Sequence, residues 1–248
     1  MNVSVCMCSY NGERYIAKQI ESVLLQLRSG DELIICDDGS TDSTIALIEG
    51  LATPQITLER NPSRLGVIGN FGKCIQLSTK EVVFLADQDD VWLPGKVSKV
   101  TSIFLANPDV TLVLSNAQVI DGENCLVAER YLHLRHGSQC SIIRALCNLA
   151  KNQYLGCAMA FKREMLDYCL PFPTDIPMHD MWIGIVNDIY GKTFYLDEPL
   201  IRHRQHGSNA SPSKHTSIWQ MLKWRSVLIK NLSGRVLGHG FGRTVSRP

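Results

Sequence analysis

The chain has 248 residues, of which 45% are hydrophobic and 20% are charged, and its formal net charge at pH 7 is +1. These values are ordinary for a soluble globular protein, and the length suffices for one large α/β domain, with or without an appendage. Composition indicates no function, but it excludes a membrane span, because no apolar run approaches the roughly 20 residues that such a helix needs.

Strand and helix patterns alternate through the first 90 residues. Short apolar runs rich in β-branched residues predict strands at residues 2–8, 32–36, 56–59 and 82–86. Apolar positions at helical spacing predict helices between them, at residues 13–27, 43–51 and 67–77. This alternation predicts a parallel sheet with helices on both faces and right-handed crossovers.

The pattern is looser after residue 90. It predicts, in chain order, a helix at 96–106, a strand at 111–116, an irregular stretch to about 140, a strand at 154–161, a helix at 180–189 and a strand at 193–196. From Pro199 we expect a loop and then a helix at 216–232. Gly234 and the three glycines after it are expected to end regular structure there.

The chain contains nine cysteines, several of them in predicted core strands. The odd count, the absence of C-x-x-C spacing and the absence of a secretory signal predict reduced, buried thiols in a cytosolic compartment. The same features argue against a disulfide framework or a structural zinc site.

Two predicted strands end in acidic residues. Asp87, Asp89 and Asp90 follow the strand at 82–86, and Asp38 follows the strand at 32–36. In a parallel sheet both tips open on one edge, where ligands of α/β sheets bind. Three carboxylates within four residues repel one another unless a cation such as Mg²⁺ or Mn²⁺ neutralises them, and these ions also bind substrate phosphates. The alternative is a pair of solvated, capped turns.

The first strand leads into Ser9-Tyr10-Asn11-Gly12. A tyrosine at that tip can stack on a nucleobase, and the alternative is a capped helix start. Neither G-x-G-x-x-G nor G-x-x-x-x-G-K-[ST] occurs, which argues against a dinucleotide-binding Rossmann domain and a P-loop.

Together these segments resemble the inverting family-two glycosyltransferases, over roughly residues 2–210. Individually the segments are weak signals, and their order and spacing give the resemblance its strength. They are Ser9-Tyr10-Asn11-Gly12, Asp37-Asp38-Gly39-Ser40-Thr41-Asp42, residues 61–70, Ala86-Asp87-Gln88-Asp89-Asp90-Val91-Trp92, His179-Asp180 and Gln205-His206-Gly207-Ser208-Asn209. The fourth segment, with Arg204 to Gly207, is also similar to bacterial enzymes that add rhamnose or hexoses to surface polysaccharide.

The resemblance implies a GT-A fold, which is a Rossmann-like, mostly parallel sheet with helices on both faces, an acceptor subregion and a C-terminal amphipathic helix. It divides the chain into a glycosyltransferase domain at 1–210 and a basic helix and tail at 211–248. Within that domain, residues 1–115 would form the nucleotide-sugar-binding half and residues 116–210 the acceptor half.

The resemblance also implies roles for individual residues. The catalytic base would be Asp180. The ligands of a Mn²⁺ or Mg²⁺ cofactor would be Asp89, Asp90 and His206. The nucleotide-sugar donor would contact Ser9, Tyr10, Asn11, Asp38, Arg64, Asn70, Asp87 and Asp89.

Several of these residues have simpler alternative interpretations. From sequence alone Asp180 is better placed as a helix N-cap than as a base, and the resemblance reverses that preference. His206 lies in a basic loop with Arg202, His203 and Arg204, where an arginine could bind a diphosphate, although the loop charge could also be merely solvated. His133 and His136 are expected to be ordinary surface residues.

The C-terminal segment is basic. Residues 214–248 contain seven Lys and Arg and no Asp or Glu, so the preceding residues have a net charge of −6. Six apolar residues fall broadly on one side of the predicted helix: Ile218, Met221, Leu222, Leu228, Ile229 and Leu232. A cationic amphipathic helix with tryptophans is typical of contact with anionic membrane surfaces, and packing on the main domain is the alternative. No aromatic-basic motif indicates nucleic-acid binding.

These observations predict an inverting, metal-dependent glycosyltransferase that uses dTDP-rhamnose or a UDP-hexose. Its acceptor would be a hydroxyl of a lipid-linked oligosaccharide in bacterial O-antigen or capsule synthesis. Its location would be cytoplasmic, peripheral on the inner membrane. A non-catalytic nucleotide-sugar-binding module and a sugar nucleotidyltransferase are the alternatives.

Overall fold

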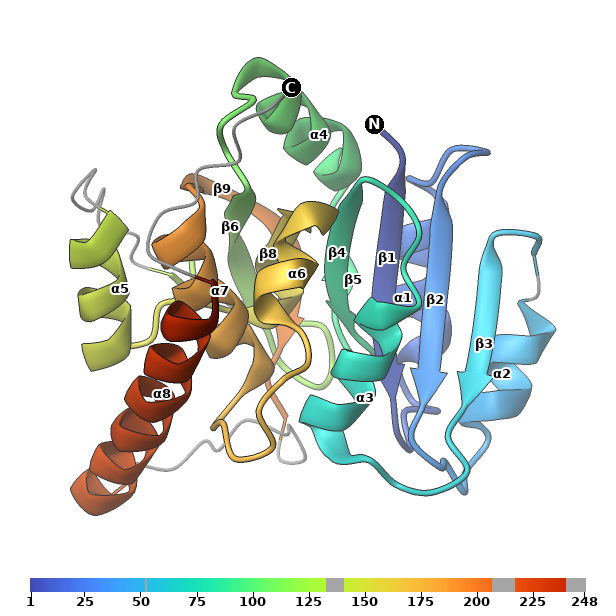
Figure 1. Ribbon diagram of the computed structural model, residues 1–248. Coiled ribbons are helices and arrows are strands. Elements are labelled where there is room, and N and C mark those ends of the chain that lie inside the picture. Colours follow the sequence, from blue (N-terminus) through green and yellow to red (C-terminus); the bar gives the residue numbers. More distant parts are fainter. Residues whose placement is uncertain (52, 133–140, 207–216, 240–248) are drawn as a thin grey trace.

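The computed structural model describes residues 1–51, 53–132, 141–206 and 217–239. Within these ranges the strands form one sheet flanked by helices (Figure 1). The strands are β1 (Val3–Ser9), β2 (Glu32–Asp37), β3 (Ile56–Arg60), β4 (Val82–Asp87), β5 (Val91–Trp92), β6 (Leu112–Ile120), β7 (Leu126–Ala128), β8 (Met159–Lys162) and β9 (Thr193–Arg204). The α-helices are α1 (Ile16–Leu24), α2 (Thr44–Gly50), α3 (Gly66–Gln76), α4 (Lys96–Ala106), α5 (Ser141–Ala150), α6 (Leu166–Cys169), α7 (His179–Tyr190) and α8 (Ile218–His239), and the 3₁₀ helices are η1 (Gly156–Ala158) and η2 (Arg163–Met165).

The strand order is β3-β2-β1-β4-β8-β6-β9-β5, and β7 pairs with β6 outside this path. The four strands β3, β2, β1 and β4 are all parallel. β8 runs antiparallel to both β4 and β6, whereas β6 and β9 are parallel. The Rossmann-like region is therefore built from the first 87 residues, and every antiparallel pair involves a strand after β4.

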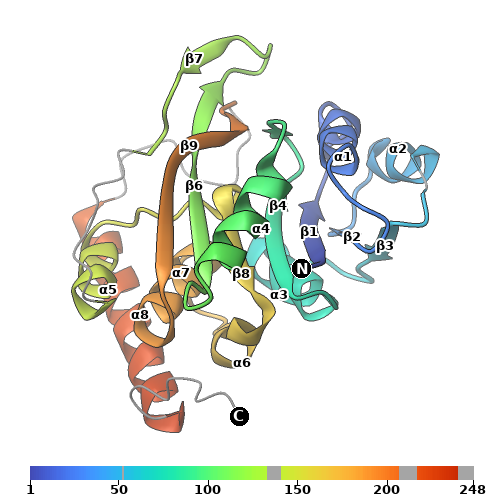
Figure 2. The same cartoon turned by 90° about the horizontal axis from the view of Figure 1, so that it is seen from above.

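Helices cover both faces of the sheet. Figure 2 shows α1 and α2 on one face and α3, α6 and α7 on the other. Because both faces are covered, β1, β2 and β4 are nearly continuous runs of buried residues, among them Val5, Met7, Ile35 and Phe84. This buried layer fixes the strand tips at which the polar residues lie.

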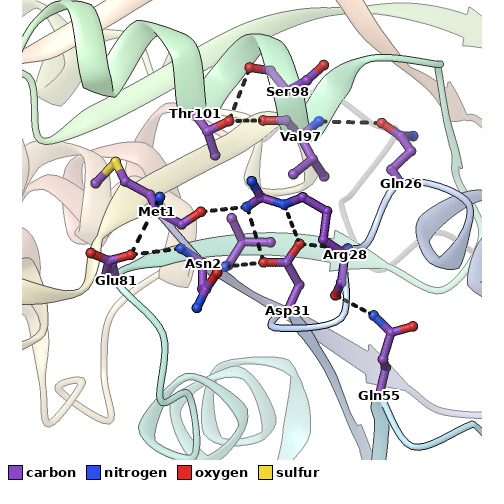
Figure 3. Close-up of polar contacts among 11 residues, drawn as sticks. Met1, Asn2, Gln26, Arg28, Asp31, Gln55, Glu81, Val97, Ser98 and Thr101 are labelled. Atoms are coloured by element: carbon purple, nitrogen blue, oxygen red, sulfur yellow. Dashed lines mark hydrogen bonds and ion pairs between the residues drawn. The ribbon is translucent and has the colours of Figure 1, made fainter.

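A polar network fixes the opposite, amino-terminal edge of the sheet (Figure 3). Arg28 donates to the carbonyl of Met1 and to the buried carboxylate of Asp31, which also accepts from Val3 N at 2.9 Å. Burial alone would raise the pKa of Asp31, but the hydrogen bonds from Arg28 and Val3 outweigh it and lower the pKa. These side chains fix the start of β1, and they do not contribute to the carboxyl-terminal edge of the sheet, where the polar strand tips lie.

The sequence patterns assigned no element between the irregular stretch that ends at about residue 140 and the strand at 154, whereas α5 occupies Ser141–Ala150. Ala145 and Leu149 of this helix pack against the core, and α5 contacts α7. The repeated apolar positions at Ile143, Leu146 and Leu149 follow a helical spacing, so the signal was present in the sequence.

The prediction that a loop begins at Pro199 is wrong, because β9 continues to Arg204. Pro199 lies where the register between β6 and β9 shifts, next to Asn116. A proline has no N–H to donate and is tolerated at such an irregularity. The extension brings His203 and Arg204 into the sheet instead of leaving them in a loop.

Helix α8 extends past the predicted end at residue 232 and continues to His239. Gly234 and Gly238 are both inside it, and a Cβ added at either position would meet no atom within 4 Å. Glycine lowers helix stability without preventing a helix. Among the described residues no helix combines the length and the apolar character that crossing a bilayer requires.

Candidate functional site

The polar strand tips meet at one edge of the sheet, as predicted. Ser9 at the end of β1 is paired with Asp37 of β2, and Cys8 is paired with Asp87 of β4. The tips of three adjacent parallel strands therefore lie side by side. The arrowheads of β2 and β3 mark this edge at the bottom of Figure 1.

Hydrogen bonds between side chains and backbone fix the turn after β2. The buried carboxylate of Asp37 accepts from Ser9 Oγ at 2.8 Å and from the backbone N–H groups of Gly39 and Ser40. Asn11 has φ = 47°, and its side chain accepts from Thr41 N at 2.9 Å. Ser9 and Asn11 thus tie the first two strand tips together, and their predicted contacts to a nucleotide remain predictions.

Tyr10 lies between two polar side chains. The guanidinium of Arg64 is 3.9 Å from the centroid of its ring. Gln88 holds its backbone, accepting from Tyr10 N at 2.9 Å and donating to Tyr10 O at 3.1 Å. A Cβ on Gly12 would come within 2.2 Å of the Gln88 side chain, so a larger residue there would displace Gln88 from its contacts with Tyr10. The structure brings Tyr10 and Arg64 together, whereas Gln88 had no sequence signal beyond its position between two aspartates.

Asp38 is buried and fixes the loop after β3. Its Oδ1 accepts from Leu65 N at 2.7 Å and from Asn61 Nδ2 at 3.0 Å, while Oδ2 accepts from Gly66 N at 2.9 Å. Asn70 is also buried, accepting from Asn61 and donating to Cys36 O. Both side chains therefore organise the segment that carries Arg64. A carboxylate oxygen can accept a second hydrogen bond, so contact between Asp38 and a ligand remains a prediction.

The carboxylates after β4 repel one another. Burial, followed by the charges of Asp90 and Asp89, raises the pKa of Asp87 to about 8, and Asp180 adds to the same effect. Burial and the charge of Asp90 also raise the pKa of Asp89, although His206 opposes that shift. The cluster therefore favours binding a cation or a proton.

Asp89 and Asp90 point at different histidines. Asp89 Oδ2 lies 2.8 Å from His206 Nε2, and both side chains are partly accessible. Asp90 is fully buried, and its Oδ1 accepts from Arg204 N at 2.9 Å. The two groups hydrogen-bond directly at this distance, and a carboxylate oxygen beside an imidazole nitrogen is also a donor set that suits a divalent ion such as Mn²⁺. Of the three predicted ligands, the structure brings together only Asp89 and His206 in this way.

Arg204 is buried and holds the loop of Asp89. Its Nε donates to Asp89 O at 2.7 Å, Nη1 donates to Asp121 O at 2.9 Å and Nη2 donates to Asn124 Oδ1 at 2.8 Å. The guanidinium also lies over the ring of Tyr15, which is 5.3 Å from the ring of His206. Each nitrogen of the Arg204 guanidinium therefore donates to an oxygen inside the protein, and the expectation that an arginine of this segment binds a diphosphate remains a prediction.

Asp180 lies in the first turn of α7. Met178 occupies the N-cap position, so the N-cap interpretation of Asp180 is wrong. Its Oδ1 accepts from Met181 N at 2.6 Å. Burial raises the pKa of Asp180 to about 6, and the backbone N–H groups of Met181 and Gly156 oppose that shift. A carboxyl group with this pKa is ionised at neutral pH and basic enough to accept a proton.

Some sequence predictions fall outside the described residues: Gly207, Ser208 and Asn209 of the last resembling segment, together with His133 and His136.

Lys96 is a buried residue that the sequence reasoning missed. Its ammonium donates to the carbonyl of Cys157 at 2.8 Å, and burial lowers its pKa to about 8. Its place in the first turn of α4 gave no sign of this contact.

The family model "Glycosyl transferase family 2" matches residues 4–169, which is more than half of the chain. The chain belongs to glycosyl transferase family 2. An uncharacterized glycosyltransferase of Nostoc sp. is 30% identical over 84% of the chain and 66% of its own length. UDP-Glc:alpha-D-GlcNAc-diphosphoundecaprenol beta-1,3-glucosyltransferase WfgD of Escherichia coli is 27% identical over 75% of the chain and 70% of its length. The chain thus spans about two thirds of the curated relatives it matches.

Solved structures confirm the GT-A fold of this family-2 chain. Residues 1–349 of TarS from S. aureus, in complex with UDP-GlcNAc, match with a TM-score of 0.70 and 16% identity over 93% of this chain and 67% of that chain. Glucosyl-3-phosphoglycerate synthase from Mycobacterium tuberculosis, in complex with Mn²⁺, UDP and phosphoglyceric acid, matches with a TM-score of 0.58 and 20% identity over 98% of this chain and 80% of that chain. A neighbour in the fold therefore binds a divalent metal.

Proposed function

We propose that the protein is an inverting glycosyltransferase that moves a sugar from a nucleotide-sugar donor to a hydroxyl of a lipid-linked oligosaccharide. Membership of family 2 and the similarity to WfgD, whose name describes a diphosphoundecaprenol acceptor, support this class of reaction. The observation that carries the proposal is that Asp180 lies beside the segment that contacts the acidic cluster: a Cβ on Gly156 would be 3.4 Å from Asp180 Cβ, and the next residue, Cys157, contacts His203, which contacts Asp90. The candidate base and the candidate metal site therefore lie near each other in the fold.

The two carboxylate sites suit the two halves of the reaction. Inversion needs one base that takes the proton of the attacking hydroxyl, on the face of the sugar opposite the leaving diphosphate. Asp180 is suited to this role because it is ionised at neutral pH. Asp89 and His206 would hold a Mn²⁺ or Mg²⁺ ion, which neutralises the leaving diphosphate. Tyr10 and Arg64 form a stacked pair that suits a nucleobase and its phosphates.

A donor panel tests the proposed reaction. Purified protein is incubated with dTDP-rhamnose, UDP-glucose or UDP-galactose, a synthetic lipid-diphosphate sugar and either Mn²⁺ or Mg²⁺, and nucleoside diphosphate release is measured. We expect release with one donor class, dependent on the acceptor and abolished by a chelator. Donor binding without release would indicate a binding module, and release of pyrophosphate from a nucleoside triphosphate and a sugar phosphate would indicate a nucleotidyltransferase.

The location at the cytoplasmic face of the inner membrane belongs to the same proposal. The apolar residues of α8 divide between two faces. Leu228 and Leu232 are buried against the core, whereas Ile218, Trp219, Leu222 and Ile229 are 64%, 78%, 55% and 50% exposed. Lys223 and Lys230 are also exposed, on turns adjoining that apolar face. An exposed apolar stripe with flanking cations fits the interface of a membrane with anionic lipids.

Flotation on vesicles tests this membrane contact. We expect the full chain to float with vesicles of phosphatidylglycerol and phosphatidylethanolamine, and to float less at high salt, because each well-placed cation contributes about 1 kcal/mol. Combining Trp219→Ala with Leu222→Ser should lower the bound fraction severalfold. The matched control combines Leu25→Ser with Leu105→Ser, which change exposed apolar residues just after α1 and within α4, 87% and 64% exposed. Equal flotation of both double variants would contradict membrane contact through α8.

A further inference from the structure

Three potential metal ligands meet inside the protein, beside the proposed active site. Asp90 follows β4, Cys157 is in η1 and His203 is near the end of β9. His203 Nδ1 lies 3.1 Å from Asp90 Oδ1 and 3.7 Å from Cys157 Sγ. The three ligand atoms all lie within 4.8 Å of one another. Among the described residues this is the one group of three such side chains close enough to share an ion.

The separations fit the edges of a zinc tetrahedron. With Zn–N and Zn–O bonds of about 2.0–2.1 Å and a Zn–S bond of about 2.3 Å, tetrahedral angles place N and O roughly 3.3 Å apart and N and S roughly 3.6 Å apart. The observed values of 3.1 Å and 3.7 Å are close to these edges. The two edges at His203 thus nearly match a zinc tetrahedron, and the ligand atoms of Asp90 and Cys157 lie within 4.8 Å of each other.

A second observation indicates a missing partner. Asp90 is fully buried, and its Oδ2 has no hydrogen-bond partner within the part of the chain that the structure describes. An unpaired buried carboxylate oxygen is costly and uncommon. Cys157 is equally buried, and the carbonyl of Cys157 is fixed by the ammonium of Lys96. The site is thus closed, polar and held by neighbouring elements.

We propose that Asp90, Cys157 and His203 bind a Zn²⁺ ion that is separate from the donor metal at Asp89 and His206. A thiolate and an imidazole favour zinc over the Mg²⁺ or Mn²⁺ that oxygen ligands prefer. One carboxylate and one thiolate make the bound ion a neutral unit, which limits the penalty of burying it. The thiol proton is released to solvent on binding, and the three side chains leave one position of the tetrahedron for a further ligand.

The ion would tie three segments together at the active site. Asp90 is adjacent to Asp89, and His203 is three residues before His206. Zinc at this position would fix the β4–β5 turn against the end of β9. It would thereby keep the side chains of Asp89 and His206 close together. This role concerns positioning, since none of the three ligands is proposed to contact the substrate.

Cobalt spectroscopy tests the proposal without any assay of glycosyl transfer. The full chain is treated with a chelator, desalted and titrated with Co²⁺. A thiolate-to-cobalt charge-transfer band and tetrahedral d–d bands should develop with one equivalent and should disappear when Zn²⁺ is added. Cys157→Ser should remove the charge-transfer band, and His203→Tyr should weaken Co²⁺ binding by about 100-fold or more. The control Cys125→Ser changes an exposed thiol and should retain the full band.

Two further variants separate this site from the proposed donor site. Asp89→Ala and His206→Ala should abolish metal-dependent donor binding but keep the cobalt bands. If Cys157→Ser does not fold, His203→Tyr and the wild-type spectrum decide the question. A wild-type protein without the charge-transfer band, or a folded Cys157→Ser variant that retains it, would overturn the zinc site and leave a hydrogen-bonded Asp–His–thiol cluster. Neither outcome would affect the proposed glycosyl transfer.

Discussion

Replacing Asp180 with asparagine should lower the turnover number by about 10²–10⁴-fold, which is the usual contribution of a general base. Asparagine keeps the size of the side chain and can still accept a hydrogen bond from Met181 N, so α7 should be undisturbed. Donor binding should stay within about twofold of wild type, since the amide removes a base and no proposed donor contact. The measurement is turnover with saturating donor and acceptor, alongside calorimetry with the donor alone.

A matched control uses Asp109→Asn. Asp109 pairs with Lys192 at the surface, just before the start of β6 and therefore at the edge opposite the strand tips. This variant should keep nearly full turnover. If Asp180→Asn retains more than about a tenth of wild-type turnover, Asp180 is not the base.

The pH dependence gives a second test of Asp180. Burial raises the pKa of this carboxyl to about 6, so it is ionised above that pH and protonated below it. Because only the ionised form accepts a proton, the titration of Asp180 should make kcat/KM fall about tenfold per unit below pH 6, in addition to the titration of Asp87 near pH 8 that the wild type and Asp180→Asn share. This acidic limb should be absent from the residual activity of Asp180→Asn. A limb near pH 4 in the wild type would indicate an unperturbed carboxyl group.

The parallel half of the fold could be predicted from sequence because the local residue pattern of each segment indicates a single type of element. The β-branched run at Val82–Asp87 and the helical spacing at Gly66–Gln76 each indicate one type of element, and both were placed to within one residue. The region after α4 was harder because its strands depend on distant partners. Strand β9 continues past Pro199 only because β6 and β5 flank it, and no local pattern reveals such pairing.

The location of the site could be predicted from the sequence, but the hydrogen bonds that orient its side chains could not. Carboxylates at strand tips are visible in the sequence, since polar residues that follow buried strands must emerge at one edge. Which of them faces a ligand depends on hydrogen bonds across the fold. Asp38 binds the loop after β3, and Asp90 turns inward to Arg204 N, while Asp89 faces His206. These differences arise from partners more than 20 residues away, which spacing cannot show.

Arg204 shows the same limit. In the sequence it is one of several cations in a basic segment, and solvated charge was the natural alternative. In the structure it is buried and donates to three separate backbone and side-chain oxygens. A basic residue becomes a structural element only when oxygens from distant turns converge on it, as those of Asp89, Asp121 and Asn124 do here.

Replacing Asp89 with alanine should lower kcat/KM by about 100-fold or more, because a divalent ion on the leaving diphosphate stabilises the transition state by several kcal/mol. Asp89 Oδ2 and His206 Nε2 are 2.8 Å apart, so each would provide one protein ligand. Without one of them the ion is held chiefly by the donor phosphates. Donor affinity should therefore become insensitive to Mn²⁺, whereas wild-type affinity should rise with it.

His206→Gln provides a graded comparison for the same site. Glutamine can still accept a hydrogen bond but is a weaker metal ligand than imidazole, so we expect a smaller loss than in Asp89→Ala and a partial rescue by high Mn²⁺. The measurement is calorimetry of donor binding across a Mn²⁺ series, with Asp109→Asn as the control that should match wild type. Manganese-independent donor binding in the wild type, or unchanged manganese dependence in both variants, would show that the ion is not held by Asp89 and His206. A carboxylate beside a histidine would then be only an ion pair that closes the end of β9 on the turn after β4.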